Sequence, residues 1–477
     1  MVLFLAACAF GVSAQLGWRA GTPEPVLDGD PDFIRMYWKS WELYQSTVVE
    51  DIRSGIPPRY SAPNGELRFD DAIAHALYAK WAVKSAPVES TLRFAVGRID
   101  ATGAAPKSVS VDTLEGVPEA AGVPILPLAI RDVCAISGNA ELARDLFASA
   151  ARRNAYLKAA YCELIPADTA SGRKESKRYR VPRTFSCAPQ VRDDPLVGDS
   201  AEALGLLFLD SYEMKMLAKL AGNDSAAAVY DSIANQFRTC LLKTWNDKLK
   251  WFASVSKDDA AVEPLLLAPF WSAITAQISD KACAASKTLM DKDRFGRWLQ
   301  FPTISASEPE FDGAGGVSPL DEYLTLRALL ESNQRFLAGY CAENMLKGYL
   351  RAAGSDLILY SAYGSDTRDK APFALSNSLD AGLITIAGLI EAVLGFQVDA
   401  EKKQVRWNVF RLDRHGIKKL RFGDNVVTLI ASARESRAGV PEIIVEAEQP
   451  FRLLLTVGER TFSKQFGAGS SVWHPGQ

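Results

Sequence analysis

The stretch SAEALGLLFLDSYEMKMLAKLAGNDSAAAVYDSIANQFRTCLLKTW, residues 200–245, decides the fold class of this chain. Its apolar residues recur mainly three and four positions apart, as on one face of an α-helix. Gly222-Asn223 interrupts the pattern, and this pair is typical of one helix that ends and another that is capped at once. A link this short makes the two helices antiparallel neighbours. The stretch therefore predicts a helical hairpin, with Asp199 as the N-cap of its first helix and Glu202 completing a capping box.

The same pattern recurs from about residue 31 to residue 396. Further paired segments are AELARDLFASAARRNAYLKAAY, 140–161, and PLDEYLTLRALLESNQRFLAGYCAENMLKGYLRAAG, 319–354. We expect about ten to twelve helices in hairpins, which is what a toroid of α-hairpins requires. Two longer irregular stretches, 165–197 and 301–317, interrupt the helices, and long ordered loops of this kind usually carry function.

The pattern changes after Gly395. The segments QVRWNVF, KKLRFG, NVVTLIASA, EIIVEAE and FRLLLTVG are short, rich in β-branched and aromatic residues, and separated by Gly, Asp, Pro or Asn. Such segments are typical of β-strands. The sequence thus predicts a mainly α chain with a helical domain over 28–396 and a small β-sandwich-like module over 397–477, joined without a low-complexity linker.

Composition restricts the partners. The chain has 477 residues, of which 48% are hydrophobic and 23% charged, and a formal net charge of -3. This is an ordinary globular composition that gives no electrostatic case for nucleic acid or an anionic membrane as a partner. A neutral or small partner is expected.

The first residues predict export. MVLFLAACAFGVSAQ is a short apolar run that ends in small residues, as in a secretory signal peptide cleaved after Ala14. Leu5-Ala6-Ala7-Cys8 also resembles a bacterial lipobox, which would place a lipid anchor on Cys8. No other stretch approaches the roughly 20 apolar residues of a membrane span. We therefore expect a periplasmic, secreted or lipid-anchored protein with no transmembrane segment.

The remaining six cysteines are widely spaced and form no CxxC, so no zinc site and no cofactor is expected. Cys240 and Cys283 lie in helical patterns and are expected to be buried free thiols.

Four stretches follow one another in an order that resembles a known family. They are YWKSWEL, 37–43, similar to a YWKxWEL helix; FDD, 69–71, similar to a WDT motif that opens the second helix; FPTISASEP, 301–309, similar to a PRIPTLSADHP loop; and LDAGLITIAGLIEAVLG, 379–395, similar to a domain-closing helix. On these, the chain resembles six-hairpin glycosidases of the trehalase and mannosylglycerate hydrolase type, particularly a bacterial branch with a short C-terminal β module. The resemblance covers nearly the whole mature chain. It implies an (α/α)6 toroid with a sugar pocket at one mouth.

The resemblance also implies a catalytic pair, in which one carboxylic acid protonates the leaving oxygen and a carboxylate roughly 6.5 to 9.5 Å away activates water. The family carries the acid in a GMDNTPR-like motif, which TFSCAPQ, 184–190, matches with Ser186 in place of the aspartate. It carries the base in a WENY-like motif, which YSAY, 360–363, matches with Ser361 in place of the glutamate. A WRGGVW-like sugar-binding loop is reduced to GAGGVS, 313–318.

A serine hydroxyl does not ionise near neutral pH, so it replaces neither an acid nor a base without a partner. The resemblance therefore implies a carbohydrate-binding protein in which hydrolysis is lost or much reduced. One of the two aspartates of FDD would line the pocket, while the other caps the second helix. The residues expected at the sugar are Asp70, Asp71, Trp38, Phe185, Tyr360 and Tyr363.

Alternative chemistries stay open. The catalytic carboxylates could have moved to Asp193 and Asp194, or to Glu308 and Glu310, which lie close enough in sequence to reach a pocket mouth. Loop acids are more often solvated or helix-capping, so this active glycosidase is the second hypothesis.

A Ser186 or Cys187 nucleophile would need an adjacent base, usually histidine. The chain has only His75, expected to be a packed or solvent-facing helix residue, His415, expected to support a turn in the β module, and His474. The same shortage of histidine disfavours lyases and epimerases.

Overall fold

The computed structural model describes residues 17–51, 56–60, 65–110, 116–117, 122–165, 178–180, 197–256, 264–313 and 315–476. The expected signal segment with Cys8, the 183–190 stretch with Phe185, Ser186 and Cys187, and the acids Asp193 and Asp194 lie outside these residues.

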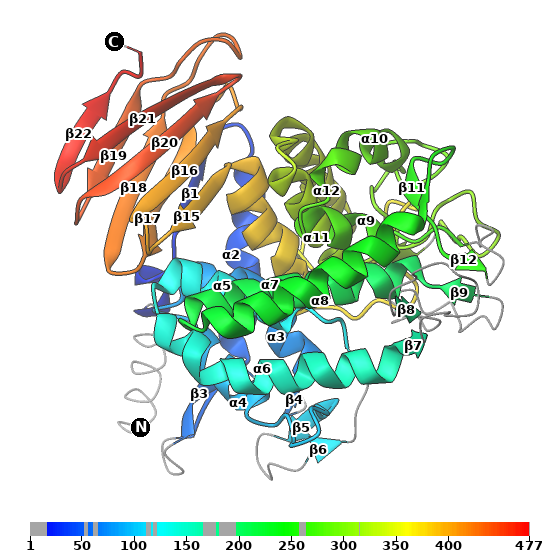
Figure 1. The fold of residues 1–477 in the computed structure, drawn as a ribbon. Helices are drawn as coiled ribbons and strands as arrows, with labels where there is room; N and C mark the ends of the chain where they lie inside the picture. The colour runs from blue at the N-terminus through cyan, green and yellow to red at the C-terminus, as the bar shows by residue number, and fades with distance from the viewer. Residues whose placement is uncertain are drawn as a thin grey trace, which may run out of the picture.

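Twelve helices of the described residues form two concentric rings (Figure 1). Each inner helix contacts the next around the ring, and the sixth contacts the first, so the inner ring closes. The inner helices are α3 (Phe69–Ala79), α5 (Leu126–Ser137), α7 (Ala201–Leu220), α9 (Ala268–Thr275), α11 (Pro319–Glu331) and the π-helical η3 (Leu383–Val393). The outer helices are α2 (Pro31–Ser46), α4 (Val88–Val96), α6 (Ala140–Tyr161), α8 (Asp224–Lys243), α10 (Ser279–Leu289) and α12 (Arg335–Ala353). The predicted toroid of helical hairpins is confirmed.

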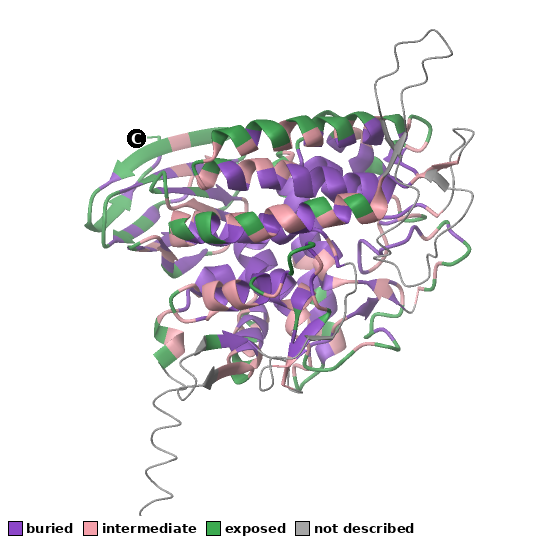
Figure 2. Ribbon diagram, turned by 60° about the horizontal axis from the view of Figure 1, so that its bottom comes forward, coloured by how far each residue is buried: buried purple, intermediate pink, exposed green. Residues whose placement is uncertain are grey.

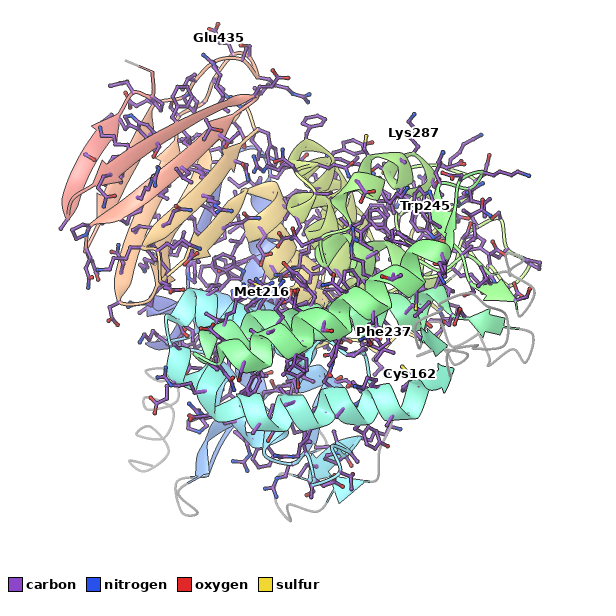
Figure 3. The ribbon with its side chains drawn as sticks, viewed as in Figure 1. Cys162, Met216, Phe237, Trp245, Lys287 and Glu435 are labelled. Atoms are coloured by element: carbon purple, nitrogen blue, oxygen red, sulfur yellow. The ribbon has the colours of Figure 1, made fainter. Side chains whose placement is uncertain are left out.

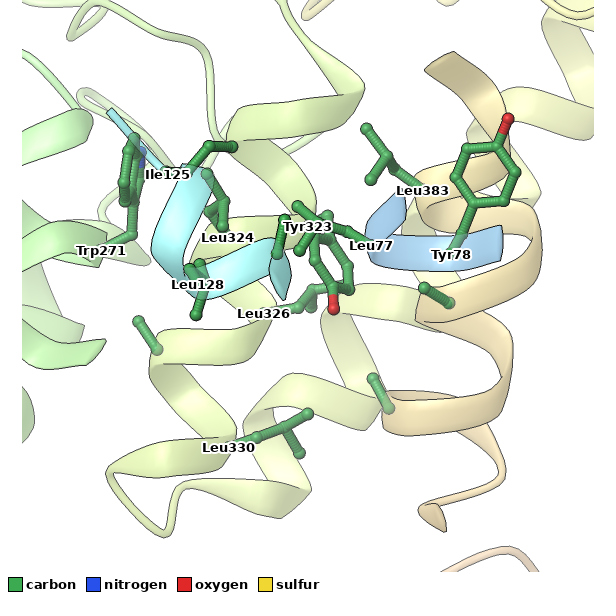
Figure 4. Packing of buried hydrophobic residues seen from close by; sticks show 14 of the residues in the cluster. Leu77, Tyr78, Ile125, Leu128, Trp271, Tyr323, Leu324, Leu326, Leu330 and Leu383 are labelled. Carbon is green, nitrogen blue, oxygen red and sulfur yellow. The ribbon is translucent and has the colours of Figure 1, made fainter. Parts of the chain in front are cut away.

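The two rings differ in burial because of their sequences. In the inner helix α7 every residue from 201 to 211 is buried, whereas in the outer helix α8 the buried residues follow a single face. A helix that is apolar all round belongs in a core, and an amphipathic helix belongs at a surface. Figure 2 shows the inner helices mostly buried and the long outer helices exposed along one side. Figure 4 shows buried side chains that project from the inner helices into the core, among them Leu77, Trp271 and Leu324.

The hairpin of residues 200–245 forms as expected at its turn but not at its start. Gly222 adopts a left-handed φ of 74°, and the Asn223 side chain caps α8 by accepting from Ala226 N–H at 3.0 Å. The N-cap of α7 is Ser200, whose Oγ accepts from Ala203 N–H at 3.2 Å. The predicted Asp199 cap and capping box are wrong, because Asp199 is the last residue of a short strand and the helix begins one residue later than the pattern indicated.

The β module is built from two sheets. The five-stranded sheet has the order β1-β17-β18-β19-β22, and the four-stranded sheet has the order β15-β16-β20-β21. The edge strand β1 (Glu24–Leu27) comes from the N-terminal side of the helical domain and pairs with β17, which the sequence did not indicate. The C-terminal strands are β15 (Phe396–Asp399), β16 (Gln404–Val409), β17 (His415–Phe422), β18 (Asn425–Ala431), β19 (Ile443–Ala447), β20 (Phe451–Val457), β21 (Arg460–Phe466) and β22 (Gly469–Trp473).

Short strands and two 3-10 turns lie in the loops between the helices. The 3-10 turns are η1 (Lys80–Ala82) and η2 (Leu379–Ala381). The strands are β2 (Val48–Asp51), β3 (Ile56–Tyr60), β4 (Glu66–Arg68), β5 (Ser108–Ser110), β6 (Gly116–Val117), β7 (Glu163–Ile165), β8 (Arg178–Arg180), β9 (Val197–Asp199), β10 (Trp245–Asn246), β11 (Trp251–Phe252), β12 (Val255–Ser256), β13 (Gly316–Val317) and β14 (Tyr363–Gly364).

The β module packs against the C-terminal ends of the inner helices. A polar cavity of about 280 Å³ lies at this junction, lined by the last turns of α5, α11 and η3 and by β15 and β16. Beside it, Lys80 Nζ lies 2.8 Å from Asp132 Oδ2 and 2.9 Å from Glu391 Oε1, and Arg327 Nη2 donates to Asp132 Oδ1 at 2.9 Å. This buried network closes one end of the ring. The opposite end, where the inner helices begin, is the mouth.

The described cysteines are all free thiols. Cys240 is buried as expected, but Cys283 is exposed, because it lies on the outer face of α10. Cys162 follows the last residue of α6, below Phe237 of α8 in the view of Figure 3. Among the described residues no helix is long and apolar enough to cross a bilayer.

Candidate functional site

Acidic residues gather in the first turns of the inner helices at the mouth. A helix N-terminus favours negative charge, which offsets part of the cost of burying carboxylates at these positions. Because outer and inner helices alternate antiparallel, the inner helices run in one direction and their first turns share one end of the ring. The acids are Asp70 and Asp71 of α3, Glu202 of α7, Asp321 and Glu322 of α11, and Asp380 of η2.

Asp71, His75 and Asp380 form the accessible centre of this group. His75 Nε2 lies 3.0 Å from Asp380 Oδ1, and Ser378 Oγ donates to Asp380 Oδ2 at 3.0 Å. His75 is itself buried, with its ring edge-on to Tyr60 at a centroid distance of 4.9 Å. Asp71 lies one helical turn before His75 and keeps 21% of its side chain exposed, while Asp380 keeps 36%. The histidine therefore lies behind a carboxylate that faces solvent.

The two carboxylates have pKa values displaced in opposite directions. Burial raises the pKa of Asp71 above its ordinary value, and the negative charge of Asp380 adds to the effect. Burial also opposes ionisation of Asp380, but hydrogen bonds from His75 and Ser378 outweigh it and lower its pKa. Paired carboxylates with separated pKa values are a common arrangement at sites that bind or transform polar ligands.

The deeper acids are parts of the wall. Asp321 accepts from Trp271 Nε1 at 3.1 Å, and burial raises its pKa to about 7. Glu322 is fully buried, accepts a hydrogen bond from the Tyr349 hydroxyl, and has a pKa that burial raises well above its ordinary value. Trp271 is itself fully buried and belongs to the core.

Asp70 packs against the loop that precedes α5. A Cβ added to Gly122 would lie 1.7 Å from Asp70 Oδ1, so only glycine fits at this point of the loop. The carboxylate of Asp70 thus lies against this loop, while the charges of His75 and Asp380 act on Asp71.

Two stretches that the sequence singled out lie side by side. Strand β13, in the reduced GAGGVS loop, pairs with β14 in the YSAY stretch, with Val317 opposite Tyr363. Ser361, at the expected position of the base, is tied to the backbone: Leu375 N–H donates to its Oγ at 2.9 Å, and its own N–H donates to Leu375 O at 3.1 Å. The hydroxyl of Ser361 therefore closes a loop.

The aromatic residues predicted to contact sugar lie in different environments. Tyr363 is fully buried and stacks on Tyr349 at 3.8 Å between centroids, and its hydroxyl accepts from Tyr360 N–H at 3.1 Å. Tyr360 is almost fully buried, with Lys370 Nζ 5.6 Å from its ring centroid. Trp38 lies on the outer helix α2, where it contacts Trp18. Their contact with a ligand stays a prediction.

The alternative acids of the 301–317 loop differ in exposure. Glu308 is buried and accepts from Ser307 Oγ at 3.3 Å, whereas Glu310 is exposed. Phe185, Ser186, Asp193 and Asp194 lie outside the described residues, so the acid side of the predicted pair stays a prediction.

The sequence did not single out Asp380, and it predicted His75 to be a packed or solvent-facing helix residue. The signal was present as Ser378-Leu379-Asp380, a capping pattern at the start of the domain-closing helix, in which Ser378 Oγ accepts from Asp380 N–H at 3.2 Å. The pairing of His75 with Asp380 was not predicted either, and it joins residues 305 positions apart. His415 is buried, and its Nδ1 lies 2.8 Å from Asp413 O at the start of β17, as the predicted turn-supporting role requires.

Comparison with known proteins identifies the fold. No protein-family profile and no characterised protein sequence matches the chain. Solved structures do. A mannosylglycerate hydrolase of family GH63 from Thermus thermophilus, solved with glucose, has a TM-score of 0.53 at 11% identity over 74% of this chain and 99% of its own. This chain has a six-hairpin glycosidase-like fold.

Two larger enzymes share the fold. A sialidase matches with a TM-score of 0.61 at 11% identity over 89% of this chain, and an α-L-rhamnosidase from Dictyoglumus thermophilum with 0.55 at 11% identity over 84%. This chain spans 40% of the length of the sialidase and 45% of that of the rhamnosidase. At such identities the likeness establishes the six-hairpin fold, and the site must be argued from its own residues. Within the described part of the chain, no group of three or more His, Cys, Asp or Glu side chains could hold a metal ion.

Proposed function

We propose that this protein binds a carbohydrate at the mouth of the helical ring, and that hydrolysis through the family's acid and base positions has been lost or much reduced. The observation that carries the proposal is Ser361, whose hydroxyl accepts from Leu375 N–H at 2.9 Å where a glutamate base is expected. Ser186, the replacement on the acid side, belongs to the proposal on sequence grounds alone. Export is proposed on the same basis, from the N-terminal segment.

Carbohydrate is the ligand class that the mouth supports. Partly exposed carboxylates accept paired hydrogen bonds from sugar hydroxyls, and Asp71 and Asp380 present such groups from opposite sides of the junction between α3 and η2. The fold neighbours include a mannosylglycerate hydrolase, a rhamnosidase and a sialidase, each named for action on a saccharide. A short α-linked saccharide is therefore proposed here as the ligand.

A second function, an active glycosidase with relocated carboxylates, is favoured by one specific observation. The pKa of Asp71 is raised while that of Asp380 is lowered, and such a separation distinguishes a general acid from a general base. The sequence offers Asp193, Asp194, Glu308 and Glu310 as further acids. Of these Glu310 is exposed and Glu308 is buried.

The test separates binding from turnover. The purified protein is incubated with α-glucosides, α-mannosides, α-rhamnosides, α-sialosides and mannosylglycerate, and released sugar is measured beside ligand affinity. The proposal expects affinity for at least one saccharide, weakened about tenfold or more by Asp380→Asn, with no release above the buffer rate. Release that disappears in Asp194→Asn, Glu310→Gln or Asp71→Asn would establish the active enzyme instead. Absence of binding to every saccharide would overturn both.

A further inference from the structure

A second cavity lies far from the mouth, on the seam between α12 and the β module. Its volume is about 490 Å³, within the range of small-molecule sites. It is lined by the start of α12, the end of β16 and the turn between β20 and β21. The loop of Glu435, labelled in Figure 3, contributes the residues on either side of that glutamate, Arg434 and Arg437.

The cavity concentrates positive charge. Arg335, Arg434 and Arg437 line it, and Glu459 is the one acidic residue among the described lining residues. Within the described part of the chain none of the three guanidinium groups forms an ion pair within 4.0 Å. Neighbouring Arg411 shows the contrast, since it pairs with Asp30 at 2.6 Å, with Asp413 at 2.9 Å and with Glu343.

Arg434 is fixed in place without being neutralised. Its Nε donates to Arg411 O at 3.0 Å, its Nη1 to Gly439 O at 2.8 Å and its Nη2 to Val409 O at 3.1 Å. Carbonyl acceptors satisfy the hydrogen bonds but supply no counter-charge. Burial and the charge of Arg437 lower the pKa of Arg434, and burial and the charge of Arg406 lower the pKa of Arg335. Arg434 and Arg437 thus repel each other unless an anion is bound.

The backbone adds to this field. Arg335 is the first residue of the 19-residue helix α12, and no side chain caps that helix end. The partial positive charge of a helix N-terminus therefore lies at the cavity together with the guanidinium groups.

The remaining groups indicate the kind of anion. Phe336 and Tyr340 lie one turn apart on α12 and are 54% and 53% exposed, and the Arg437 guanidinium lies 4.5 Å from the centroid of the Phe336 ring. Exposed rings beside polar groups suit the apolar face of a sugar. The neutral polar side chains that line the cavity can bond sugar hydroxyls: Asn333, Asn408, Thr456 and Thr461.

We propose that this seam, formed by Arg335, Phe336, Arg434 and Arg437, is a second saccharide site that binds the carboxylate of an acidic sugar such as a uronic acid. The guanidinium groups of Arg335 and Arg437 would hold the carboxylate by paired hydrogen bonds, Arg434 would add its positive charge, and Phe336 would hold the ring. A net charge of -3 over the chain disfavours a long polyanion such as nucleic acid, so a local match to one acidic saccharide is preferred. The site is independent of the proposed function of the mouth.

The test compares one saccharide with and without its charge. Short oligogalacturonates and their fully methyl-esterified forms are titrated into the full chain. We expect the free acid to bind and the ester to bind at least tenfold more weakly, with the affinity for the acid falling at high salt. Equal binding of acid and ester, or no binding of the acid, would overturn the proposal.

Matched variants locate the site. The double substitution Arg335→Gln with Arg437→Gln should weaken oligogalacturonate binding at least tenfold, and Phe336→Ala should weaken it about tenfold. Arg144→Gln, an exposed arginine of α6 away from the seam, is the charge-matched control and should leave the affinity unchanged. Arg434 is avoided because its substitution would release the carbonyls that shape the loop. An unchanged affinity in the double variant would overturn the assignment.

Two further measurements distinguish this saccharide site from the mouth and from a general polyanion surface. The double variant Arg335→Gln with Arg437→Gln should leave the binding of a neutral saccharide at the mouth unchanged, so failure at one site is distinguishable from failure at the other. A DNA duplex of equal charge should bind more weakly than the oligogalacturonate. Equal or tighter binding of the duplex, with the same sensitivity to the double variant, would show a general polyanion surface and overturn the saccharide proposal.

Discussion

At the scale of single residues, the mouth contains one acidic residue that the sequence predicted and one that it did not. Asp71 was predicted from the FDD motif and lies at the accessible centre of the mouth. Asp380 was not, because its meaning depends on His75, which is 305 positions away and 3.0 Å from it in space. His75 looked like an ordinary helix residue for the same reason. A local motif predicts the helix that carries an ionisable side chain. The residue that shifts the pKa of that side chain is brought beside it only when the ring of inner helices closes.

Asp380 stabilises the fold through its negative charge. Its pKa is lower in the folded chain than the roughly 3.9 of an unfolded chain, so this stabilisation is complete above about pH 4 and is lost as pH falls through the folded pKa. Asp380→Asn should therefore lower the free energy of unfolding by about 1–2 kcal/mol at pH 7, because the bond to His75 weakens. Urea titrations at pH 7 and pH 3 measure this. The difference from the parent protein should shrink at pH 3, and Asp424→Asn, at an exposed site, should show no change at either pH.

The negative charge of Asp71 is expected to lower the free energy of unfolding, whereas that of Asp380 raises it. Burial raises its pKa, so its ionisation costs stability as pH rises through the folded pKa, and the cost is absent below about pH 4. Asp71→Asn should raise the free energy of unfolding by up to about 1 kcal/mol at pH 7 and leave it unchanged at pH 3. The same urea titrations measure this change, and a lower free energy of unfolding for Asp71→Asn at pH 7 would contradict the prediction. A charge kept at such a cost is typical of a functional position.

At the scale of elements, the helices were predictable and their ends were less so. Periodicity gave the hairpins because an inner helix buried all round and an amphipathic outer helix leave different patterns, as α7 and α8 do. The N-cap of α7 was misplaced by one residue, since Asp199 and Ser200 are both good caps and only the course of β9 distinguishes them. Strand β1 was missed because its partner β17 lies at the other end of the chain.

The closed end of the ring depends on Asp132. This buried carboxylate lies 2.8 Å from Lys80 Nζ and accepts from Arg327, so it joins η1, α5 and α11. Asp132→Ala should lower the free energy of unfolding by about 3–5 kcal/mol, because two buried cations lose a partner. The matched control is Asp145→Ala, which breaks an exposed pair with Arg93 at 2.6 Å and should cost no more than about 1 kcal/mol. Equal losses in the two variants, measured by chemical denaturation, would refute a structural role for the network.

At the scale of the whole molecule, the helical ring and the β module share one continuous core. The largest cluster of buried apolar side chains extends from α2 through the inner helices to β16, β18 and β20. Strand β1 and the ion pair of Arg411 with Asp30 tie the N-terminal segment to the module as well. The predicted architecture of toroid and β module is thus correct, and the sequence did not show that the two parts are interlocked by the N-terminal segment.

The interlocking predicts one unfolding transition. The whole chain should melt in a single calorimetric peak, with backbone amides of η3 and β16 exchanging hydrogen at similar rates near the transition. A separate, earlier peak for the β module would contradict a shared core. Arg411→Gln should move the single peak to lower temperature without splitting it.

The central claim is that the mouth binds saccharide without cleaving it, and isothermal calorimetry tests binding and turnover in the same trace. An α-linked saccharide from the panel is titrated into the parent protein and into Asp380→Asn. If the mouth binds the saccharide without cleaving it, the heat saturates with added ligand and returns to baseline after each injection. The affinity for the saccharide falls about tenfold in Asp380→Asn. A steady heat flow that persists between injections and disappears in Asp194→Asn, Glu310→Gln or Asp71→Asn would show hydrolysis and contradict the account.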